Sequence, residues 1–206
     1  MKNTTLFIET LKIVNGLYIR PETHIQRIQH TQLEFFGKTD RISLDPTLIP
    51  ADKRSGTVKC RITYDQTIQK IEFESYHPRT IHSLALVDGT DTDYHLKYAD
   101  RNCLHKLLQL RGKCDDILIY RNNQITDTSY SNIVLYDGVD YVTPSTYLLN
   151  GLKRQYLLQQ GKIKEKDISI PDLPKYQRLY LINALLDIED NISVDPQHIH
   201  LNPRNR

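Results

Sequence analysis

The residues of this sequence that could do chemistry stand in four short groups along the chain. A lysine amine can act as a nucleophile or a base once burial lowers its pKa. The planar donors of arginine suit anionic oxygens, and a helix that starts after glycine offers backbone N–H groups to an anion. Each residue type is common on protein surfaces, so a single one indicates little. The information lies in the order of the groups, which are His24-x-x-Arg27, Lys97-x-x-x-Arg101, residues 125–132 (ITDTSYSN), and Thr143-Pro144 followed by residues 149–154 (LNGLKR).

This order resembles the class IV aminotransferases, a family that includes 4-amino-4-deoxychorismate lyase, D-amino acid aminotransferase and branched-chain amino acid aminotransferase. The resemblance covers nearly the whole chain. It begins at residues 6–16 (LFIETLKIVNG) and continues through the H-x-x-R segment and residues 97–101 (KYADR). It is densest at residues 115–144 (DDILIYRNNQITDTSYSNIVLYDGVDYVTP). Residues 182–185 (INAL) are similar to a segment of the lyase branch.

The resemblance implies pyridoxal 5'-phosphate (PLP) as cofactor, held as a Schiff base by Lys97, since only a primary amine can form that bond with an aldehyde. Arg27 corresponds to the arginine that grips the cofactor phosphate. Asp127 corresponds to the acidic residue that pairs with the protonated ring nitrogen. Residues 151–154 (GLKR) resemble the turn whose backbone N–H groups receive the phosphate. The other residues that the resemblance assigns to the cofactor site are Ser131, Asn132, Gly151, Leu152, Lys153, Asn183 and Ala184.

Two positions depart from the family pattern. Asp127 stands where the family has glutamate, which is one methylene longer, and Lys153 stands where the family usually has threonine. These departures leave a non-catalytic or degenerate cofactor-binding protein open as an alternative. Asp127 also has a purely structural interpretation, as a carboxylate that caps the turn at Thr128 and Ser129.

Turn residues and hydrophobic spacing predict the elements that position these groups. Asn15-Gly16 between two β-rich segments is typical of a hairpin, and Pro21 and Gly37 bracket a segment with helical spacing. We expect strands or short apolar segments at residues 6–14, 17–19, 57–64, 68–76, 116–120, 124–127, 132–136, 139–142, 179–182 and 192–194, and helices between residues 21 and 37, at 99–111 and at 152–160.

Strands and helices in both halves predict the α/β (α+β) class, and the resemblance implies the two-lobed fold of the D-amino acid aminotransferase type. His77-Pro78-Arg79 interrupts the strand pattern, because proline restrains the residue before it. We therefore expect an N-terminal α/β lobe at residues 1–78. The C-terminal lobe, residues 79–206, would hold a meandering sheet, Lys97 and the phosphate-binding turn.

Composition narrows the classes of partner. The 206 residues are 39% hydrophobic and carry 27 Lys and Arg against 25 Asp and Glu, so no electrostatic feature predicts nucleic-acid binding. The first twenty residues lack the apolar core of a signal peptide and the length of a membrane span, so we expect a cytoplasmic protein without a membrane partner. Three cysteines without a CxxC pair predict neither a disulfide framework nor a zinc site, and His198-Ile-His200 has no third ligand nearby in the sequence, so we expect no metal.

The leading functional hypothesis is a lyase that converts 4-amino-4-deoxychorismate to 4-aminobenzoate and pyruvate in folate biosynthesis. An amino acid transaminase of the branched-chain or D-amino acid type is the alternative. Either activity implies a small-molecule amine as substrate. Weaker substrate-binding candidates are Thr10, Arg79 and Arg101, although a surface ion pair explains either arginine equally well. The resemblance also implies a homodimer.

Overall fold

The structure, a computed structural model, describes residues 5–39 and 41–201. Contacts divide the chain into two compact units. Unit 1 comprises Met1–His77 and Leu96–Asp100, and unit 2 comprises Pro78–His95 and Arg101–Arg206. The sequence prediction differs from this division at residues 96–100, which it assigned to the C-terminal lobe together with Lys97.

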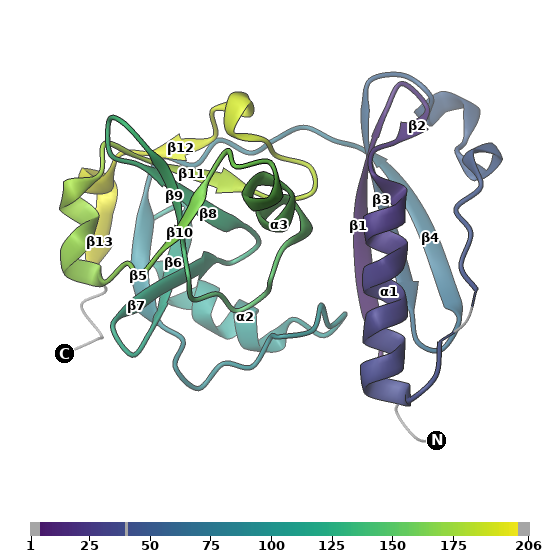
Figure 1. Ribbon diagram of the computed structural model, residues 1–206, viewed down its shortest axis with the longest axis horizontal. Helices are drawn as coiled ribbons and strands as arrows, with labels where there is room; N and C mark the ends of the chain where they lie inside the picture. The colour runs from purple at the N-terminus through teal and green to yellow at the C-terminus, as the bar shows by residue number, and fades with distance from the viewer. Residues whose placement is uncertain (1–4, 40, 202–206) are drawn as a thin grey trace. The chain divides into compact units, whose positions relative to one another are not determined.

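Unit 1 is an antiparallel sheet with a helix on one face (Figure 1). The strand order is β2-β1-β3-β4, and the sharp turn between β1 and β2 uses the positive φ angles of Asn15 (49°) and Gly16 (80°). Pro21 begins the helix, and Gly37 ends it with its N–H donated to the Leu33 carbonyl at 3.0 Å. The elements are β1 (Phe7–Val14), β2 (Leu17–Tyr18), α1 (Pro21–Phe36), two 3-10 helices (Pro46–Leu48 and Ala51–Lys53), β3 (Thr57–Tyr64) and β4 (Ile68–Ser75).

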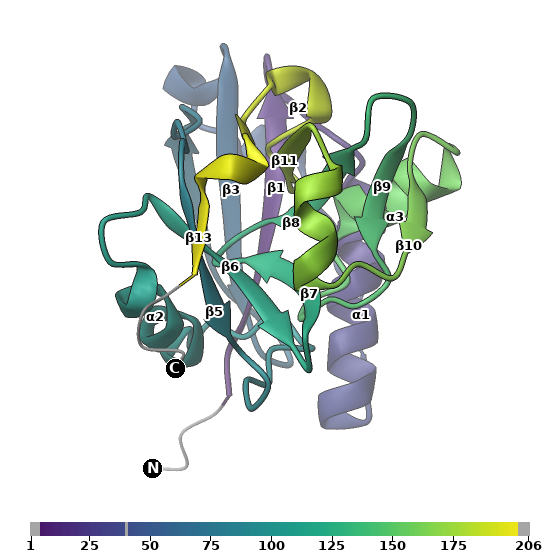
Figure 2. The same ribbon diagram turned by 90° about the vertical axis from the view of Figure 1, so that its left-hand side faces the viewer.

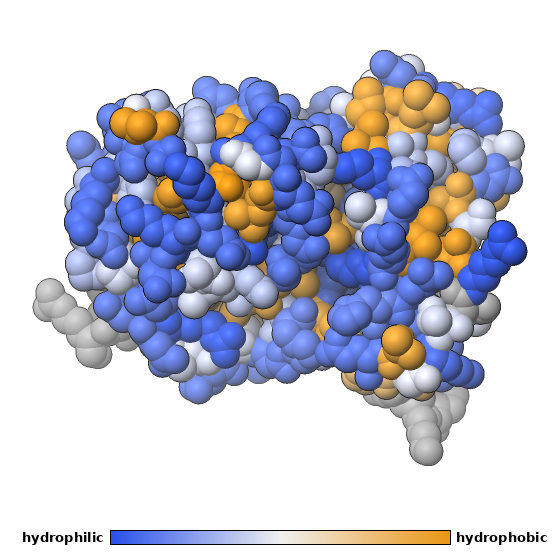
Figure 3. Space-filling model, viewed as in Figure 1, coloured by the Kyte–Doolittle hydropathy of each residue, from blue (hydrophilic) through white to orange (hydrophobic). Residues whose placement is uncertain are grey.

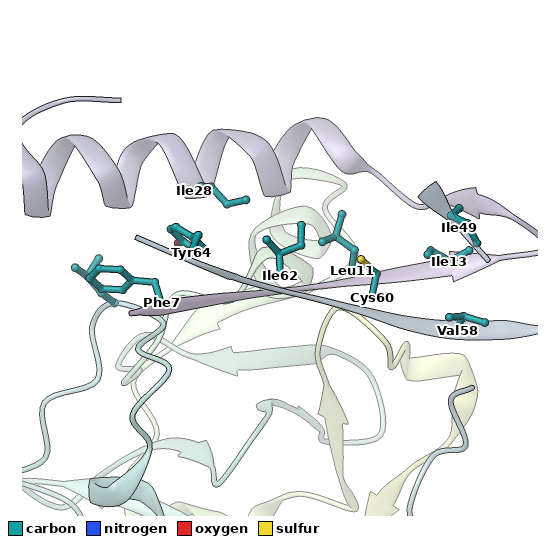
Figure 4. Close-up of a cluster of buried hydrophobic side chains, with 10 residues drawn as sticks. Phe7, Leu11, Ile13, Ile28, Ile49, Val58, Cys60, Ile62 and Tyr64 are labelled. Atoms are coloured by element: carbon teal, nitrogen blue, oxygen red, sulfur yellow. The ribbon is translucent and has the colours of Figure 1, made fainter. Parts of the chain in front are cut away.

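The core of unit 1 lies between α1 and the sheet. Alternate residues of β1 and β3 point toward the helix, as the period of a strand requires, and Ile28 packs against them from α1 (Figure 4). The buried members of this cluster are Phe7, Leu11, Ile13, Ile28, Ile49, Val58, Cys60, Ile62, Tyr64 and Leu96.

Residues 97–99 run along the free edge of β1. The Ile8 N–H donates to the Lys97 carbonyl at 2.9 Å, and the Ala99 N–H donates to the Leu6 carbonyl at 2.8 Å. Because of these hydrogen bonds, Lys97 belongs to unit 1 and not to unit 2. The same hydrogen bonds explain why the helix expected from residue 99 begins only at Asn102, because the backbone before it is held as an extended segment.

The described residues of unit 2 form two sheets. One has the order β10-β9-β8-β11-β12, and the other has the order β13-β5-β6-β7, whose strands lie side by side in Figure 2. The elements are β5 (Leu84–Asp88), α2 (Asn102–Leu108), a 3-10 helix (Gln109–Arg111), β6 (Asp116–Arg121), β7 (Gln124–Thr128), β8 (Asn132–Tyr136), β9 (Tyr141–Pro144), α3 (Leu152–Gln159), β10 (Lys164–Lys166), β11 (Arg178–Ile182), β12 (Ser193–Val194) and β13 (Ile199–Leu201), with further 3-10 helices at Ile170–Lys175, Ile188–Asp190 and Pro196–His198.

Most predicted elements are confirmed, and the mixed α/β class with them. Three strands were not predicted. The first four residues of β5 are all buried, so its sequence shows no alternation of polar and apolar residues. β10 and β13 have three residues each, too few for a periodic pattern.

Hydrophilic residues cover most of the surface of unit 2 on the face shown in Figure 3, where apolar residues form separate patches. Within residues 5–39 and 41–201, no helix has the length and apolar character needed to cross a membrane.

Candidate active site

A buried carboxylate lies at the end of β7. Asp127 is the fourth residue of that strand, and only 6% of its surface is exposed. Its Oδ1 accepts a hydrogen bond from Asn132 Nδ2 at 2.8 Å, and its Oδ2 accepts from the Leu148 and Leu149 N–H groups at 3.0 Å each. The donors therefore come from β8 and from the segment before α3, not from the turn at residues 128–129 that a local cap would use.

The environment of Asp127 disfavours its charge. Burial raises the pKa of this carboxyl to about 6, although the hydrogen bonds from Leu149, Asn132 and Leu148 and the charge of Arg154 act in the opposite direction. A buried carboxylate with a shifted pKa is a feature of functional sites. Asp127 is thus suited to pair with a cationic ring nitrogen, which would compensate its charge.

The start of α3 is packed tightly against the same network. Gly151 precedes the helix and has no side chain with which to cap it, so it supplies no side-chain acceptor for the first N–H groups of the helix. A Cβ at this position would lie 1.9 Å from Asn132 Oδ1. Asn132 also donates to the Leu149 carbonyl at 2.9 Å. Only glycine fits here, and the geometry of the helix start depends on Asn132.

A second polar contact joins the β7–β8 turn to the segment after β11. Asn183 Nδ2 lies 2.9 Å from Ser131 Oγ, and Asn183 Oδ1 accepts from the Leu185 and Leu186 N–H groups at 2.8 and 3.1 Å. Ala184 is the next residue in this turn. The structure thus brings together the predicted site residues of unit 2 around β7, β8, α3 and the 183–186 turn.

Two cations at the start of α3 are buried. Lys153 is 3% exposed and forms an ion pair with Asp187, just before the 3-10 helix Ile188–Asp190. Arg154 donates to the Pro144 carbonyl at 2.8 Å and forms an ion pair with Glu165 of β10. Both side chains therefore connect α3 to neighbouring segments of unit 2. Leu152, the first residue of α3, is half-buried.

In unit 1, Arg27 lies on α1 beside a buried carboxylate that sequence reasoning missed. Arg27 Nη2 lies 2.5 Å from Glu9 Oε1, and His24 Nδ1 lies 2.9 Å from the same oxygen. A signal for Glu9 was available, because it interrupts the buried face of an otherwise alternating strand. Thr10, the next residue, is half-buried, and its N–H donates to Glu9 Oε1 at 2.9 Å.

Lys97 belongs to the extended segment beside β1 and is half-buried. The two other arginine candidates lie in unit 2. Arg101 Nη2 donates to the Ser129 carbonyl at 2.6 Å, which fixes the turn before Ser131. Arg79 lies over the Tyr130 ring, 4.8 Å from its centroid. Among the described residues, no group of three or more His, Cys, Asp or Glu side chains could hold a metal ion.

Comparison with known proteins decides the family. The model of the family described as "Amino-transferase class IV" matches residues 6–189 of this chain. The chain belongs to the class IV aminotransferases. The predicted resemblance and fold class are therefore confirmed, and the family is one of PLP-dependent enzymes.

Relatives of this class IV aminotransferase include both lyase-named and aminotransferase-named proteins. An uncharacterized protein from Haemophilus influenzae is 33% identical over 182 residues, covering 86% of this chain and 96% of the relative. A crystal structure from Haemophilus somnus 129PT, described as a "putative 4-amino-4-deoxychorismate lyase", is 31% identical, covers 90% of this chain and 98% of that one, and has a TM-score of 0.79. A PLP-bound hypothetical aminotransferase from Mycobacterium tuberculosis is 14% identical, covers 99% of this chain and 85% of that one, and has a TM-score of 0.73.

The residues present fit PLP in this family member. The close approach of Gly151 to Asn132 leaves no room for a side chain at position 151, which suits a phosphate received by backbone N–H groups. The buried Asp127 supplies an acceptor for a ring N–H. Lys97 supplies the primary amine, and Arg27 supplies a planar set of donors.

Proposed function

We propose that this protein is a PLP-dependent lyase that converts 4-amino-4-deoxychorismate to 4-aminobenzoate and pyruvate. The observation that carries the PLP assignment is the arrangement around Asp127, a buried carboxylate hydrogen-bonded to Asn132 and to the segment that leads into α3. The likeness to the Haemophilus somnus protein supports the choice of lyase. We also propose a cytoplasmic location, and the proposed reaction implies a role in folate biosynthesis.

Each residue has a distinct task in this proposal. Bound PLP supplies an aldehyde for covalent attachment and a protonated ring that stabilises negative charge on an attached substrate. Asp127 keeps the proton on the ring nitrogen, and Arg27 binds the phosphate together with the N–H groups at the start of α3. Lys97 Nζ provides the point of attachment and then, as a free amine, moves the proton of the substrate carbon.

The lyase reaction needs no second substrate. All the atoms of 4-amino-4-deoxychorismate appear in 4-aminobenzoate and pyruvate, and the amine stays on the ring. A transaminase must instead pass its amine to a 2-oxo acid. The two activities share the residues named above, so the residues do not distinguish them. The requirement for a 2-oxo acid as acceptor does.

The test is incubation of the PLP-loaded protein with 4-amino-4-deoxychorismate while pyruvate and 4-aminobenzoate are measured. We expect both products in equal amounts without any added 2-oxo acid. The Lys97→Ala variant is the control, and it should form neither product.

Two other outcomes would overturn the lyase assignment. Turnover of branched-chain or D-amino acids that requires a 2-oxo acid, with no pyruvate from 4-amino-4-deoxychorismate, would make the protein a transaminase. PLP binding without turnover of either kind of substrate would make it the degenerate cofactor-binding protein that Asp127 and Lys153 left open.

A further inference from the structure

Glu9 is a carboxylate on the apolar face of a strand. It lies in β1 between Phe7 and Leu11, on the side that packs against α1, and none of its surface is exposed. An ionised carboxylate in such surroundings strongly destabilises the folded chain unless charged donors compensate it. Its presence at this position therefore depends on its partners.

Those partners stand one turn apart on α1. Arg27 donates through Nε to Glu9 Oε2 at 2.8 Å and through Nη2 to Oε1 at 2.5 Å, which is the two-pronged geometry that guanidinium and carboxylate favour. His24 Nδ1 lies 2.9 Å from Oε1. The Thr10 N–H donates to Oε1 at 2.9 Å. The carboxylate is thus fixed from the strand and from the helix at once.

The charge on Glu9 persists despite its burial. Burial acts to raise the pKa of Glu9, but the charge of Arg27, the hydrogen bond and charge of His24, and the hydrogen bond from Arg27 outweigh it and hold the pKa well below its usual range. Glu9 is therefore ionised at any pH at which the enzyme would work.

We propose that Glu9 is a positioning residue that orients the Arg27 guanidinium for binding the PLP phosphate, with His24 as its second support. The inference rests on the proposed function, in which Arg27 binds that phosphate. The Arg27 side chain retains 15% of its surface exposed, whereas Glu9 retains none. An anion can therefore reach the arginine but not the glutamate, so Glu9 acts only through Arg27.

Two physical effects of Glu9 on phosphate binding oppose each other. Its negative charge offsets part of the attraction that Arg27 exerts on a phosphate. Its hydrogen bonds hold the long Arg27 side chain in one orientation, so less conformational freedom is lost when the phosphate binds. The proposal requires the second effect to be larger, and the two effects predict opposite results when Glu9 is neutralised.

The test compares the dissociation constants of PLP and of pyridoxal, which lacks the phosphate, by fluorescence titration of the full-length protein. The ratio of the pyridoxal constant to the PLP constant reports the contribution of the phosphate. In Glu9→Gln we expect this ratio to fall about tenfold, equal to about 1.4 kcal/mol, while the pyridoxal constant changes little. If Glu9 had a purely structural role, Glu9→Gln would lower the thermal midpoint of unfolding and leave this ratio unchanged.

A second variant and a control make the result specific. Glu9→Asp keeps the charge but shortens the side chain by one methylene, so we expect a smaller fall in the ratio. If Glu9→Gln does not fold, Glu9→Asp is the test, and an unchanged ratio in that variant would overturn the proposal. Glu72→Gln removes an exposed glutamate of β4 and should leave the ratio unchanged.

The pair of residues can also be tested together. Arg27→Lys should lower the ratio by itself, because a point charge replaces a planar set of donors. Adding Glu9→Gln to Arg27→Lys should then change the ratio no further. An unchanged or raised ratio in a folded Glu9→Gln protein would overturn the proposal.

The proposed function fails in a different way. If the wild-type protein does not form a covalent adduct with PLP, the proposed function and this inference are both overturned. If the adduct forms and Arg27→Lys lowers the ratio but the Glu9 variants do not, this inference alone is wrong.

Discussion

At the scale of single residues, the raised pKa of Asp127 makes the stability of the folded protein depend on pH. The ordinary pKa of an aspartate is 3.8, and burial raises that of Asp127 to about 6. Between these values the folded protein binds more protons at this residue than the unfolded chain does. The free energy of unfolding therefore falls as the pH rises through this window.

Replacing Asp127 by Asn should remove this part of the pH dependence. A rise of the Asp127 pKa from 3.8 to about 6 corresponds to on the order of 3 kcal/mol. We expect the wild-type protein without PLP to lose about that much stability, relative to Asp127→Asn, between pH 4 and pH 7. Urea unfolding at a series of pH values measures the difference. A difference that does not change with pH would contradict the origin assigned to the shift.

A second residue-scale prediction concerns the space beside Gly151. In Gly151→Ala the new Cβ would lie 1.9 Å from Asn132 Oδ1, so Asn132 must move and lose its hydrogen bonds to Asp127 and to the Leu149 carbonyl. We expect the free energy of unfolding to fall by about 1–3 kcal/mol.

The matched experiment for Gly151 uses Asn132→Ala as the background. Removing the Asn132 side chain also removes the clash, so Gly151→Ala should then have a smaller effect on urea unfolding. Equal effects in the two backgrounds would mean that the close approach does not limit position 151.

Glu9 shows how much of the site could be predicted from sequence. The order of Arg27, Lys97 and Asp127 along the chain is visible in the sequence, and it identified the family. The sequence shows that Glu9 interrupts an apolar strand face, but it does not show that Arg27 lies beside Glu9, because the packing of β1 against α1 is set by the three-dimensional fold. The same is true of the hydrogen bonds between Asp127 and residues 148–149, which are 21 and 22 positions away.

At the scale of elements, local sequence signals predict turns and helix ends correctly. They do not predict which distant segments pair with each other. Asn15-Gly16 predicts its hairpin because both residues accept positive φ angles, and Gly37 ends α1 for the same reason. The sequence predicts the start of α2 three residues early, since hydrogen bonds to β1, and not the local sequence, hold residues 97–99 extended.

The ion pair between Lys153 and Asp187 gives a prediction at the element scale, because it joins α3 to the segment after β11. The Lys153 side chain is buried, whereas about a third of the Asp187 side chain is exposed. Removing the aspartate leaves a buried cation without its carboxylate, whereas removing the lysine leaves a carboxylate that water can reach. Asp187→Ala should therefore destabilise the protein more than Lys153→Met.

Chemical unfolding of both single variants and of the double variant measures this asymmetry. We expect the double variant to resemble Lys153→Met, because no buried cation remains in it. A larger loss of stability in Lys153→Met than in Asp187→Ala would show that the buried cation does not determine the effect. PLP titrations on the same proteins show whether the link between α3 and the 183–187 segment supports cofactor binding.

At the scale of the whole molecule, the contribution of Lys97 to unit 1 changes the interpretation of the two lobes. The chain enters unit 2 at residue 78, returns to unit 1 at 96–100, and then re-enters unit 2. The sequence could not predict this excursion, because the pairing of residues 97–99 with β1 joins positions about ninety residues apart.

The assembly of the molecule stays a prediction. Resemblance to the family implies a homodimer, and the mass of one chain is 24.1 kDa. Light scattering on the purified protein should give about twice that mass. A single-chain mass at micromolar concentration, in a protein that still turns over its substrate, would contradict the dimer.

The attachment of PLP to Lys97 can be tested by chemical reduction and peptide mapping. The PLP-loaded protein is treated with borohydride, digested and mapped by mass spectrometry. We predict a reduced pyridoxyl group on the peptide that contains Lys97 and no such group on Lys97→Ala. Modification of a different lysine, or no modification at all under saturating PLP, would show that Lys97 does not hold the cofactor.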